Sequence, residues 1–264
     1  MKISVLTPSY NSGPYLKKSI QSVLDQSYKN WEHIVVDGGS NDSTSEILKS
    51  YDHLKWVSEV DKGQSDAMNK AFNMCSGEII VYLNADDYFY TEAFETIVSK
   101  FQEEPQTDMI VGNLDVDKYG KIEPRTNATV LWKDLSILKG RFPLNPVSYA
   151  YKRHVQEKIG DFPVDEHYTM DYWFLIRAFY LFKIKRIEDI LGCFVFVENN
   201  KSSTISGEFQ IQAPHAMSFT KRYTPWRLPY VYTMLSIHHL NPKPNKFLSG
   251  LVKMLVTLKN IVKR

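Results

Sequence analysis

The chain has little that would place it outside the cell or across a membrane. Only two of its 264 residues are cysteine, Cys75 and Cys193, which excludes a disulfide framework or a four-cysteine zinc site and favours a reducing compartment. The apolar stretch at the N-terminus ends at Pro8 and is too short for the core of a signal peptide. No run of about 18 apolar residues occurs that would span a bilayer. We expect a chain that is neither exported nor integral to a membrane.

Two common nucleotide-binding motifs are also missing. The segment TPSYNSG at 7–13, which follows the first expected strand, lacks the pattern Gly-x-Gly-x-x-Gly of dinucleotide-binding folds. The P-loop pattern Gly-x-x-x-x-Gly-Lys-[Ser/Thr] occurs nowhere in the chain. These absences disfavour an NAD-dependent enzyme and a P-loop nucleotide hydrolase.

Acidic residues are missing after Glu208. Residues 209–264 contain nine Lys or Arg and therefore carry a charge of +9. Because the net charge of the whole chain is +2, residues 1–208 carry a charge of −7. Within 245–262 the apolar residues lie on one helical face and the lysines largely on the other. We predict a helical basic C-terminal extension that binds an anionic membrane surface. The alternative is a helix packed on the protein with its lysines in solvent, and nucleic acid is disfavoured because no recognition motif accompanies the charge.

Apolar runs and helical patterns alternate over the first hundred residues, as in a mostly parallel sheet with crossover helices. The expected strands are 3–7, 32–36, 55–59 and 78–83, and the expected helices are 14–25, 43–51 and 65–75, with Ser43 and Ser65 as N-caps. The pattern predicts an α/β fold with a Rossmann-like sheet and flanking helices.

Polar and acidic residues follow each of these strands. TPSYN follows the first strand, Asp37 the second, Asp61 the third, and Asp86 with Asp87 the fourth. The carboxyl ends of parallel strands meet at one edge of a sheet, where ligands bind. Carboxylates gathered there repel one another unless a cation or hydrogen-bond donors lie between them. The pattern favours a hard divalent cation such as Mg²⁺ or Mn²⁺.

Five segments in the same order resemble the family 2 glycosyltransferases with a GT-A fold. They are TPSYN at 7–11, VVDGGSNDST at 35–44, EVDKGQSDAMNKAF at 59–72, GEIIVYLNADD at 77–87 and MDYWFLIR at 170–177. The resemblance implies a catalytic domain over 1–208, with a nucleotide-sugar half at 1–113 and an acceptor half at 114–208, followed by the extension at 209–264.

The resemblance assigns the nucleotide side of the site. Thr7, Pro8 and Tyr10 match the loop that holds the nucleobase, and Asp37 matches the carboxylate that accepts from the base N–H. Asp66 and Asn69 are expected on a helix that faces the same crevice, and the alternative for both is a solvated helical turn. The further donor-binding residues that it implies are Gly39, Asp61, Lys62, Asn84 and Asp87.

Asn84-Ala85-Asp86-Asp87 corresponds to the Asp-x-Asp metal motif of the family, with Asn84 in place of the first Asp. Asp86 is therefore the expected ligand of Mn²⁺ or Mg²⁺, while Asn84 is expected to contact ribose or phosphate and Asp87 the donor sugar. A divalent cation would stabilise the charge on the departing nucleoside diphosphate.

Transfer with inversion needs one carboxylate to take the proton from the acceptor hydroxyl. Asp171 begins the expected helix MDYWFLIR and resembles the base of the family's acidic motif, in which Glu often stands where this chain has Met170. Asp165, Glu166 and His167 are rival bases. The other alternative is that Asp171 only favours a helix N-terminus.

Turn residues predict further local structure in the acceptor half. A hairpin is expected around 117–121, and a loop at 142–146 before a strand at 147–151. The segment 199–203 is either a loop that closes over the diphosphate or a plain surface loop.

Together the motifs predict a metal-dependent, inverting hexosyl- or N-acetylhexosaminyltransferase. Its donor is expected to be a UDP-sugar, and its acceptor a hydroxyl of a lipid-linked glycan in surface polysaccharide or O-antigen synthesis, at the cytoplasmic face of the membrane. The string Gln-x-x-Arg-Trp of processive synthases is absent, which favours addition of a single sugar. The alternatives are a polyprenyl-phosphate glycosyltransferase and a non-catalytic nucleotide-sugar-binding homologue, which Asn84 would permit.

Overall fold

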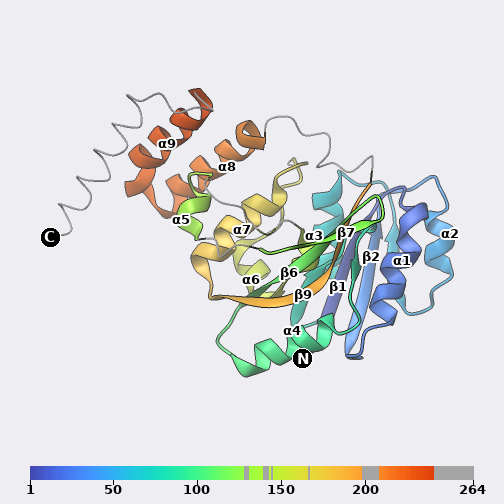
Figure 1. Ribbon diagram of the computed structural model, residues 1–264. Helices are drawn as coiled ribbons and strands as arrows, with labels where there is room; N and C mark the ends of the chain where they lie inside the picture. The colour runs from blue at the N-terminus through green and yellow to red at the C-terminus, as the bar shows by residue number, and fades with distance from the viewer. Residues whose placement is uncertain (128–130, 139–142, 144, 166, 198–207, 241–264) are drawn as a thin grey trace.

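The computed structural model describes residues 1–127, 131–138, 143, 145–165, 167–197 and 208–240 (Figure 1). Several sequence predictions lie outside these residues: the rival base Glu166, most of the loop at 142–146, the loop at 199–203 and the amphipathic helix at 245–262.

Four parallel strands form the first half of one mixed sheet, and all four were predicted. In the order of the sheet they are β3 (Leu54–Ser58), β2 (Trp31–Asp37), β1 (Ile3–Ser9) and β4 (Ile79–Tyr82). Because these strands are parallel, their C-terminal ends lie along one edge, which we call the carboxyl edge.

The sheet continues from β4 with shorter and mixed pairings. The order is β4-β8-β6-β9-β5, with β7 paired to β6. β8 runs antiparallel to both β4 and β6, so its N-terminal end lies at the carboxyl edge. The bounds are β5 (Tyr88–Phe89), β6 (Met109–Lys118), β7 (Lys121–Arg125), β8 (Tyr149–Lys152) and β9 (Ile184–Phe196).

The predicted hairpin joins β6 to β7. Its turn residues Tyr119 (φ 55°) and Gly120 (φ 87°) both adopt left-handed backbone, as a tight two-residue hairpin turn requires. The Gly120 N–H donates to Asp117 Oδ1 at 2.7 Å. The predicted strand at 147–151 begins only at Tyr149, because Pro146–Ser148 form the 3-10 turn η1.

Helices cover both faces of the sheet. One face carries α1 (Gly13–Leu24), α2 (Thr44–Lys49) and α4 (Ala93–Glu103), and the other carries α3 (Gln64–Met74), α6 (Arg153–Ile159) and α7 (Met170–Leu181). The prediction of Ser65 as an N-cap is wrong: α3 begins at Gln64 after Gly63, whose φ of 110° suits glycine.

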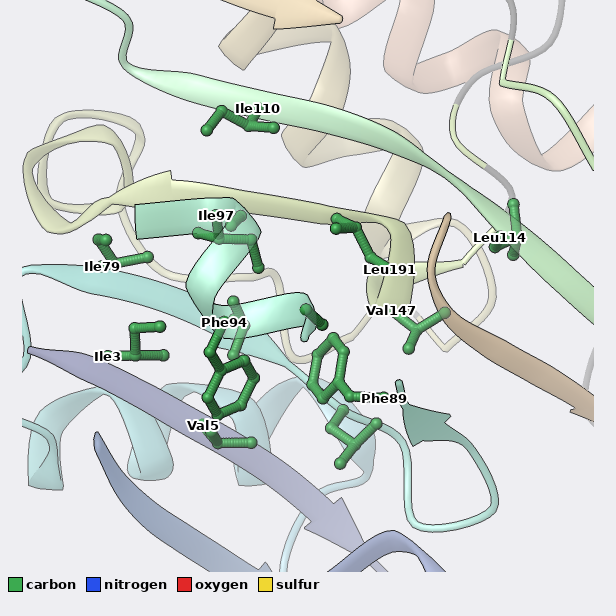
Figure 2. Close-up of a cluster of buried hydrophobic side chains, with 14 of the residues drawn as sticks. Ile3, Val5, Ile79, Phe89, Phe94, Ile97, Ile110, Leu114, Val147 and Leu191 are labelled. Carbon is green, nitrogen blue, oxygen red and sulfur yellow. The ribbon is translucent and has the colours of Figure 1, made fainter. Parts of the chain in front are cut away.

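The alternation of strand residues explains the two layers. Ile3 and Val5 of β1 point toward α4 and pack with Phe94 and Ile97 (Figure 2), whereas Leu6 packs toward α3 and α7. Phe94 is fully buried, and burial of such a side chain contributes about 1.5–3 kcal/mol to the free energy of unfolding. The packed layers hold the carboxyl edge in a fixed shape.

The C-terminal helices pack against α7. α8 (Glu208–Tyr223), the short turn η3 (Pro225–Arg227) and α9 (Leu228–Leu240) follow β9 in the chain, and α5 (Trp132–Leu135) lies beside them (Figure 1). Phe219 and Val231 are fully buried with Tyr172 and Ile176 of α7. In the described part of the chain no helix has the length and hydrophobicity needed to cross a membrane.

Candidate active site

β1 ends in buried side chains, and the loop that follows it exposes a tyrosine. Thr7 and Pro8 are buried, and the Thr7 hydroxyl is hydrogen-bonded to His33 Nε2 at 2.9 Å. Tyr10, by contrast, exposes 64% of its surface. Thr7 and Pro8 can therefore meet a ligand only through the backbone, while the Tyr10 ring is available for stacking.

Asp37, at the end of β2, is fixed by three hydrogen bonds. Its Oδ2 accepts from the Ser40 backbone N–H at 3.0 Å and from the Ser58 hydroxyl at 2.6 Å, and its Oδ1 accepts from the Ser40 hydroxyl. Asp37 is fully buried. Ser58 ends β3, so this carboxylate joins the ends of two neighbouring strands beside the loop that carries Tyr10.

The segment after β3 lies directly against the loop after β2. A Cβ atom at Gly38 would come within 2.8 Å of Asp61 Oδ2, and Gly39 has a φ of 80°. Only residues without a side chain allow this approach. The other carboxylate oxygen of Asp61 accepts from the Gly63 N–H at 2.7 Å.

The residues around the start of α3 serve partly structural roles. Lys62 is exposed, and its backbone N–H donates to Asp66 Oδ2 at 3.1 Å. Asp66 also forms an ion pair with Lys70 at 3.4 Å. Asn69 is buried and forms two hydrogen bonds, of 2.8 and 2.9 Å, with the backbone of Phe162. Asn69 thus joins α3 to the segment before α7 and does not face the crevice.

Asp87 is the buried centre of the Asn84–Asp87 segment. Its Oδ2 accepts from Asn84 Nδ2 at 2.9 Å and from Asn145 Nδ2 at 2.8 Å, and its Oδ1 accepts from the Val195 N–H at 2.9 Å. Burial and the neighbouring carboxylate of Asp86 raise the pKa of Asp87 to about 8. Asp87 therefore connects the loop after β4 with β9 and with the turn before β8.

Asp86 differs from its neighbour in the hydrogen bonds that its carboxylate receives from the described part of the chain. Among the described residues, no other residue donates a hydrogen bond to its carboxylate, and burial raises its pKa. No group of three or more His, Cys, Asp or Glu that could hold a metal occurs in the described residues. One unpaired carboxylate at the carboxyl edge fits a divalent cation that takes its other ligands from substrate phosphates and water.

Asp171 lies in the first turn of α7, as predicted. The Tyr149 hydroxyl donates to its Oδ1 at 3.5 Å, and burial raises the pKa of Asp171 to about 6. Burial and the Asp171 carboxylate raise the pKa of Tyr149 well above its ordinary value, so Tyr149 remains a donor. A carboxylate with a pKa close to neutral is suited to accept a proton.

The two described rival bases lie in more exposed positions. Asp165 and His167 are both exposed. The Nδ1 atom of His167 would lie 3.2 Å from a Cβ atom at Gly63, so the imidazole covers the loop before α3. Among the described candidates, Asp171 has the environment that a general base needs.

Asn145 and Tyr149 are the site residues that sequence reasoning missed. Asn145 binds Asp87, and Tyr149 binds Asp171. The two residues flank the turn η1, where Asn145 Oδ1 also accepts from the Val147 N–H at 2.8 Å. An Asn before a Pro is a sequence pattern typical of such a turn, but nothing in the sequence indicates which carboxylates it would bring together.

Comparison with known proteins decides the family. Residues 4–165 match the model of the Glycosyl transferase family 2. The chain belongs to this family. Among curated proteins, this family 2 glycosyltransferase is similar to the uncharacterized glycosyltransferase alr2836 of Nostoc sp. The two are 30% identical over an alignment of 245 residues that covers 84% of this chain and 74% of the relative.

A second relative is the GalNAc(5)-diNAcBac-PP-undecaprenol beta-1,3-glucosyltransferase of Campylobacter jejuni. It is 29% identical to the family 2 glycosyltransferase over an alignment of 147 residues that covers 53% of this chain and 47% of the relative. The match thus spans less than half of the Campylobacter protein.

Solved structures share the fold of this family 2 glycosyltransferase. S. aureus TarS in complex with UDP-GlcNAc superposes with a TM-score of 0.69 at 18% identity, over 89% of this chain and 70% of that one. The mannosyltransferase PcManGT of Pyrobaculum calidifontis, solved with GDP-Man and Mn²⁺, gives a TM-score of 0.56 at 17% identity, over 97% and 79%. The predicted GT-A fold is confirmed.

Proposed function

We propose that this glycosyltransferase moves a single sugar, with inversion, from a UDP-sugar to a hydroxyl of a lipid-linked glycan. One observation carries the proposal: the short segment 145–149 binds Asp87 of the metal motif through Asn145 and the base Asp171 through Tyr149. The groups for activating the donor and the acceptor are thereby assembled at the carboxyl edge. The UDP-GlcNAc complex of S. aureus TarS and the undecaprenol-linked substrate in the name of the Campylobacter relative support these substrate classes.

The donor side holds the nucleotide with groups that are already ordered. The Tyr10 ring stacks on the base, and the backbone of the loop after β1 lies beside Asp37 and Asp61. Asn11 fixes this loop, because its N–H donates to the Ser40 hydroxyl at 2.7 Å and its Oδ1 accepts from the Asn41 N–H at 3.0 Å. Such preorganisation lowers the entropic cost of binding.

The reaction needs charge stabilisation on one side and proton removal on the other. A divalent cation on Asp86, when bound, supplies Lewis-acid stabilisation of the departing diphosphate. Asp171 accepts the acceptor hydroxyl proton while the acceptor oxygen bonds to C1 and the bond from C1 to the diphosphate breaks. Tyr149 holds the Asp171 carboxylate in position. No covalent enzyme intermediate is needed, so a single carboxylate suffices.

The nucleotide part of the proposal can be tested on Tyr10. Tyr10→Ala is expected to weaken UDP binding by about 5- to 150-fold, because stacking of a base on an aromatic ring contributes about 1–3 kcal/mol. Tyr10→Phe keeps the ring and should bind within about twofold of the native chain. Calorimetric titration with UDP and Mn²⁺ measures the UDP affinity of both variants. If Tyr10→Ala bound UDP as tightly as the native chain, Tyr10 would not be part of the nucleotide site.

We also propose that the enzyme binds the membrane surface peripherally. Trp226 and Tyr232, on η3 and α9, expose 73% and 64% of their surface, and aromatic residues of this kind favour the membrane interface. The whole region from 209 onward carries nine basic and no acidic residues. Each basic residue near an anionic surface contributes about 1 kcal/mol to binding.

Deletion of residues 241–264 is expected to release the protein from vesicles rich in phosphatidylglycerol. The deletion removes six of the nine basic residues, so the vesicle affinity should fall well over tenfold. Sedimentation with vesicles measures the bound fraction, and vesicles of phosphatidylcholine alone serve as the control. Unchanged sedimentation of the shortened chain would contradict the proposal.

A further inference from the structure

Two cavities lie along one side of α1, outside the residues assigned above to donor, metal and base. The first, of about 360 Å³, is lined from α1 by Lys18, Gln21, Ser22 and Asp25 and from the other side by residues 88–91. The second, of about 390 Å³, lies between Tyr15 of α1, the turn of the β6–β7 hairpin and residues 195–197 at the end of β9.

The two cavities adjoin the same face of α1. Tyr15, Lys18 and Ser22 are spaced by three and four residues, so they lie on the same face of α1. On the opposite side, β5 pairs with β9, with Tyr88 beside Cys193, and β9 then continues into the second cavity. We call this feature the α1 groove. Each of the two cavities is by itself within the size range of small-molecule binding sites.

Aromatic residues make up six of the fifteen residues that line the α1 groove. Tyr15 exposes 40% and Tyr119 72% of its surface. The Tyr119 ring stands edge-on to Phe196, with 6.3 Å between the ring centres, and Tyr88 and Tyr90 line the first cavity in the same edge-to-face arrangement. The face of an aromatic ring carries a partial negative charge. It therefore attracts the polarised C–H groups on the flat side of a pyranose ring.

Charge and polarity select among ligand classes. The described lining carries two carboxylates, Asp25 and Asp117, and one ammonium group, Lys18, which lies 3.6 Å from the centre of the Tyr88 ring. A lining without excess positive charge does not suit a polyanion such as a phosphate polymer. Gln21, Ser22 and the carboxylates offer hydrogen bonds to hydroxyl groups, which a lipid chain could not use. The combination fits a neutral saccharide.

One end of the groove adjoins the active site. Val195 lines the second cavity, and its N–H donates to Asp87 Oδ1 at 2.9 Å. We propose that the α1 groove binds the neutral oligosaccharide part of the acceptor, away from the hydroxyl that reacts. This inference rests on the proposed function in assuming that the acceptor is a glycan. Binding energy from such a remote part of a substrate improves capture of the substrate at the reacting centre.

The test uses the full chain and three neutral probes, maltotetraose, cellotetraose and chitotetraose. Tyr15→Ala and Tyr119→Asn each remove a ring without disturbing the backbone, because Ala favours a helix and Asn tolerates the left-handed φ of 55° at residue 119. Met74→Ala on α3 is the matched control, because it truncates a large side chain that is 39% exposed, against 40% for Tyr15, and that lines neither cavity. Saturation-transfer NMR and calorimetry measure the affinity.

We expect at least one probe to bind the native chain and the control equally. Tyr119→Asn and Tyr15→Ala should each weaken that binding at least tenfold, and Tyr119→Phe should retain it. The inference would be overturned if none of the three probes bound the native chain, or if both groove variants bound the probe with the affinity of the native chain. UDP titration of the same samples separates the two proposals. If the native chain does not bind UDP, the proposed function is contradicted, while the measured saccharide binding to the α1 groove is unaffected.

Discussion

Asp171→Asn is expected to lower the rate of sugar transfer by about 10²- to 10⁴-fold, the usual contribution of a general base. Asparagine has nearly the same shape and can still accept from Tyr149, which donates to Asp171 at 3.5 Å, so UDP binding should not change. Asp165→Asn is the matched control, because Asp165 is exposed and close in sequence. Its rate should equal that of the native enzyme. Transfer is measured by release of UDP with and without acceptor.

The same substitution should stabilise the fold. The pKa of Asp171 is raised to about 6, against an ordinary value of about 3.9, so ionisation of Asp171 at neutral pH costs the folded state about 3 kcal/mol. The native enzyme should therefore lose stability as the pH rises from about 4 to 6, and the Asn variant should lack this loss. Thermal unfolding across that pH range measures the difference.

The pH dependence of transfer follows from the same group. A base must be deprotonated to act, so kcat/KM should fall by a factor of ten for each pH unit below about 6. A native rate in Asp171→Asn would contradict the assignment and would favour the polyprenyl-phosphate alternative, whose phosphate acceptor needs little base catalysis.

Asp86→Ala is expected to abolish transfer, with a loss of at least about 10³-fold. No other described residue donates a hydrogen bond to the Asp86 carboxylate. The substitution therefore removes the expected cation ligand without breaking a hydrogen bond between described residues. Stabilisation of the departing diphosphate by a cation contributes several kcal/mol, and each 1.36 kcal/mol corresponds to about a tenfold change in rate. Calorimetry should also show that Mn²⁺ no longer strengthens UDP binding.

Asp52→Ala serves as the control for Asp86→Ala, because Asp52 is an exposed carboxylate in the turn before β3. It should retain both transfer and the effect of Mn²⁺. Transfer by Asp86→Ala near the native rate, or native transfer in the presence of a chelator, would show that no cation acts through this residue.

Asn84 gains a physical explanation from the structure. Its side-chain amide donates to Asp87 at 2.9 Å and its carbonyl accepts from Gln64 at 3.2 Å. An ionised aspartate at this position could not donate to Asp87 and would add another carboxylate beside those of Asp86 and Asp87, which burial already disfavours in the charged form. Asn84, in place of the first Asp of the Asp-x-Asp motif, therefore supplies a hydrogen bond to the buried Asp87 carboxyl group. Asp86 is then the carboxylate available to a cation.

The sequence was most informative where periodicity and turn chemistry act locally. The four parallel strands and the hairpin at 117–121 follow from hydrophobic patterns and from the Tyr119-Gly120 turn. The positions of Asp37, Asp61, Asp86 and Asp87 after strands predicted that they meet at one edge. These features depend on residues close together in the chain.

Long-range contacts account for what sequence reasoning missed. Asn145 reaches Asp87 across 58 residues, and Tyr149 reaches Asp171 across 22. Asn69 pairs with the backbone of Phe162, 93 residues away, although the resemblance had implied that it lies on a helix facing the crevice. Such partners are fixed by the packing of α3, α7 and the turn η1 against the sheet, which no local pattern specifies.

The most direct test of the central claim is release of the nucleotide from a panel of UDP-, GDP-, dTDP- and CMP-sugars, measured with Mn²⁺, with Mg²⁺ and with EDTA. The account predicts slow release of UDP from one UDP-sugar with either cation, and none with EDTA or in Asp86→Ala. Tight cation-dependent binding of UDP-sugars without any release, even when lipid-linked acceptors are added, would identify a non-catalytic homologue. Failure of every nucleotide-sugar to bind would contradict the account as a whole.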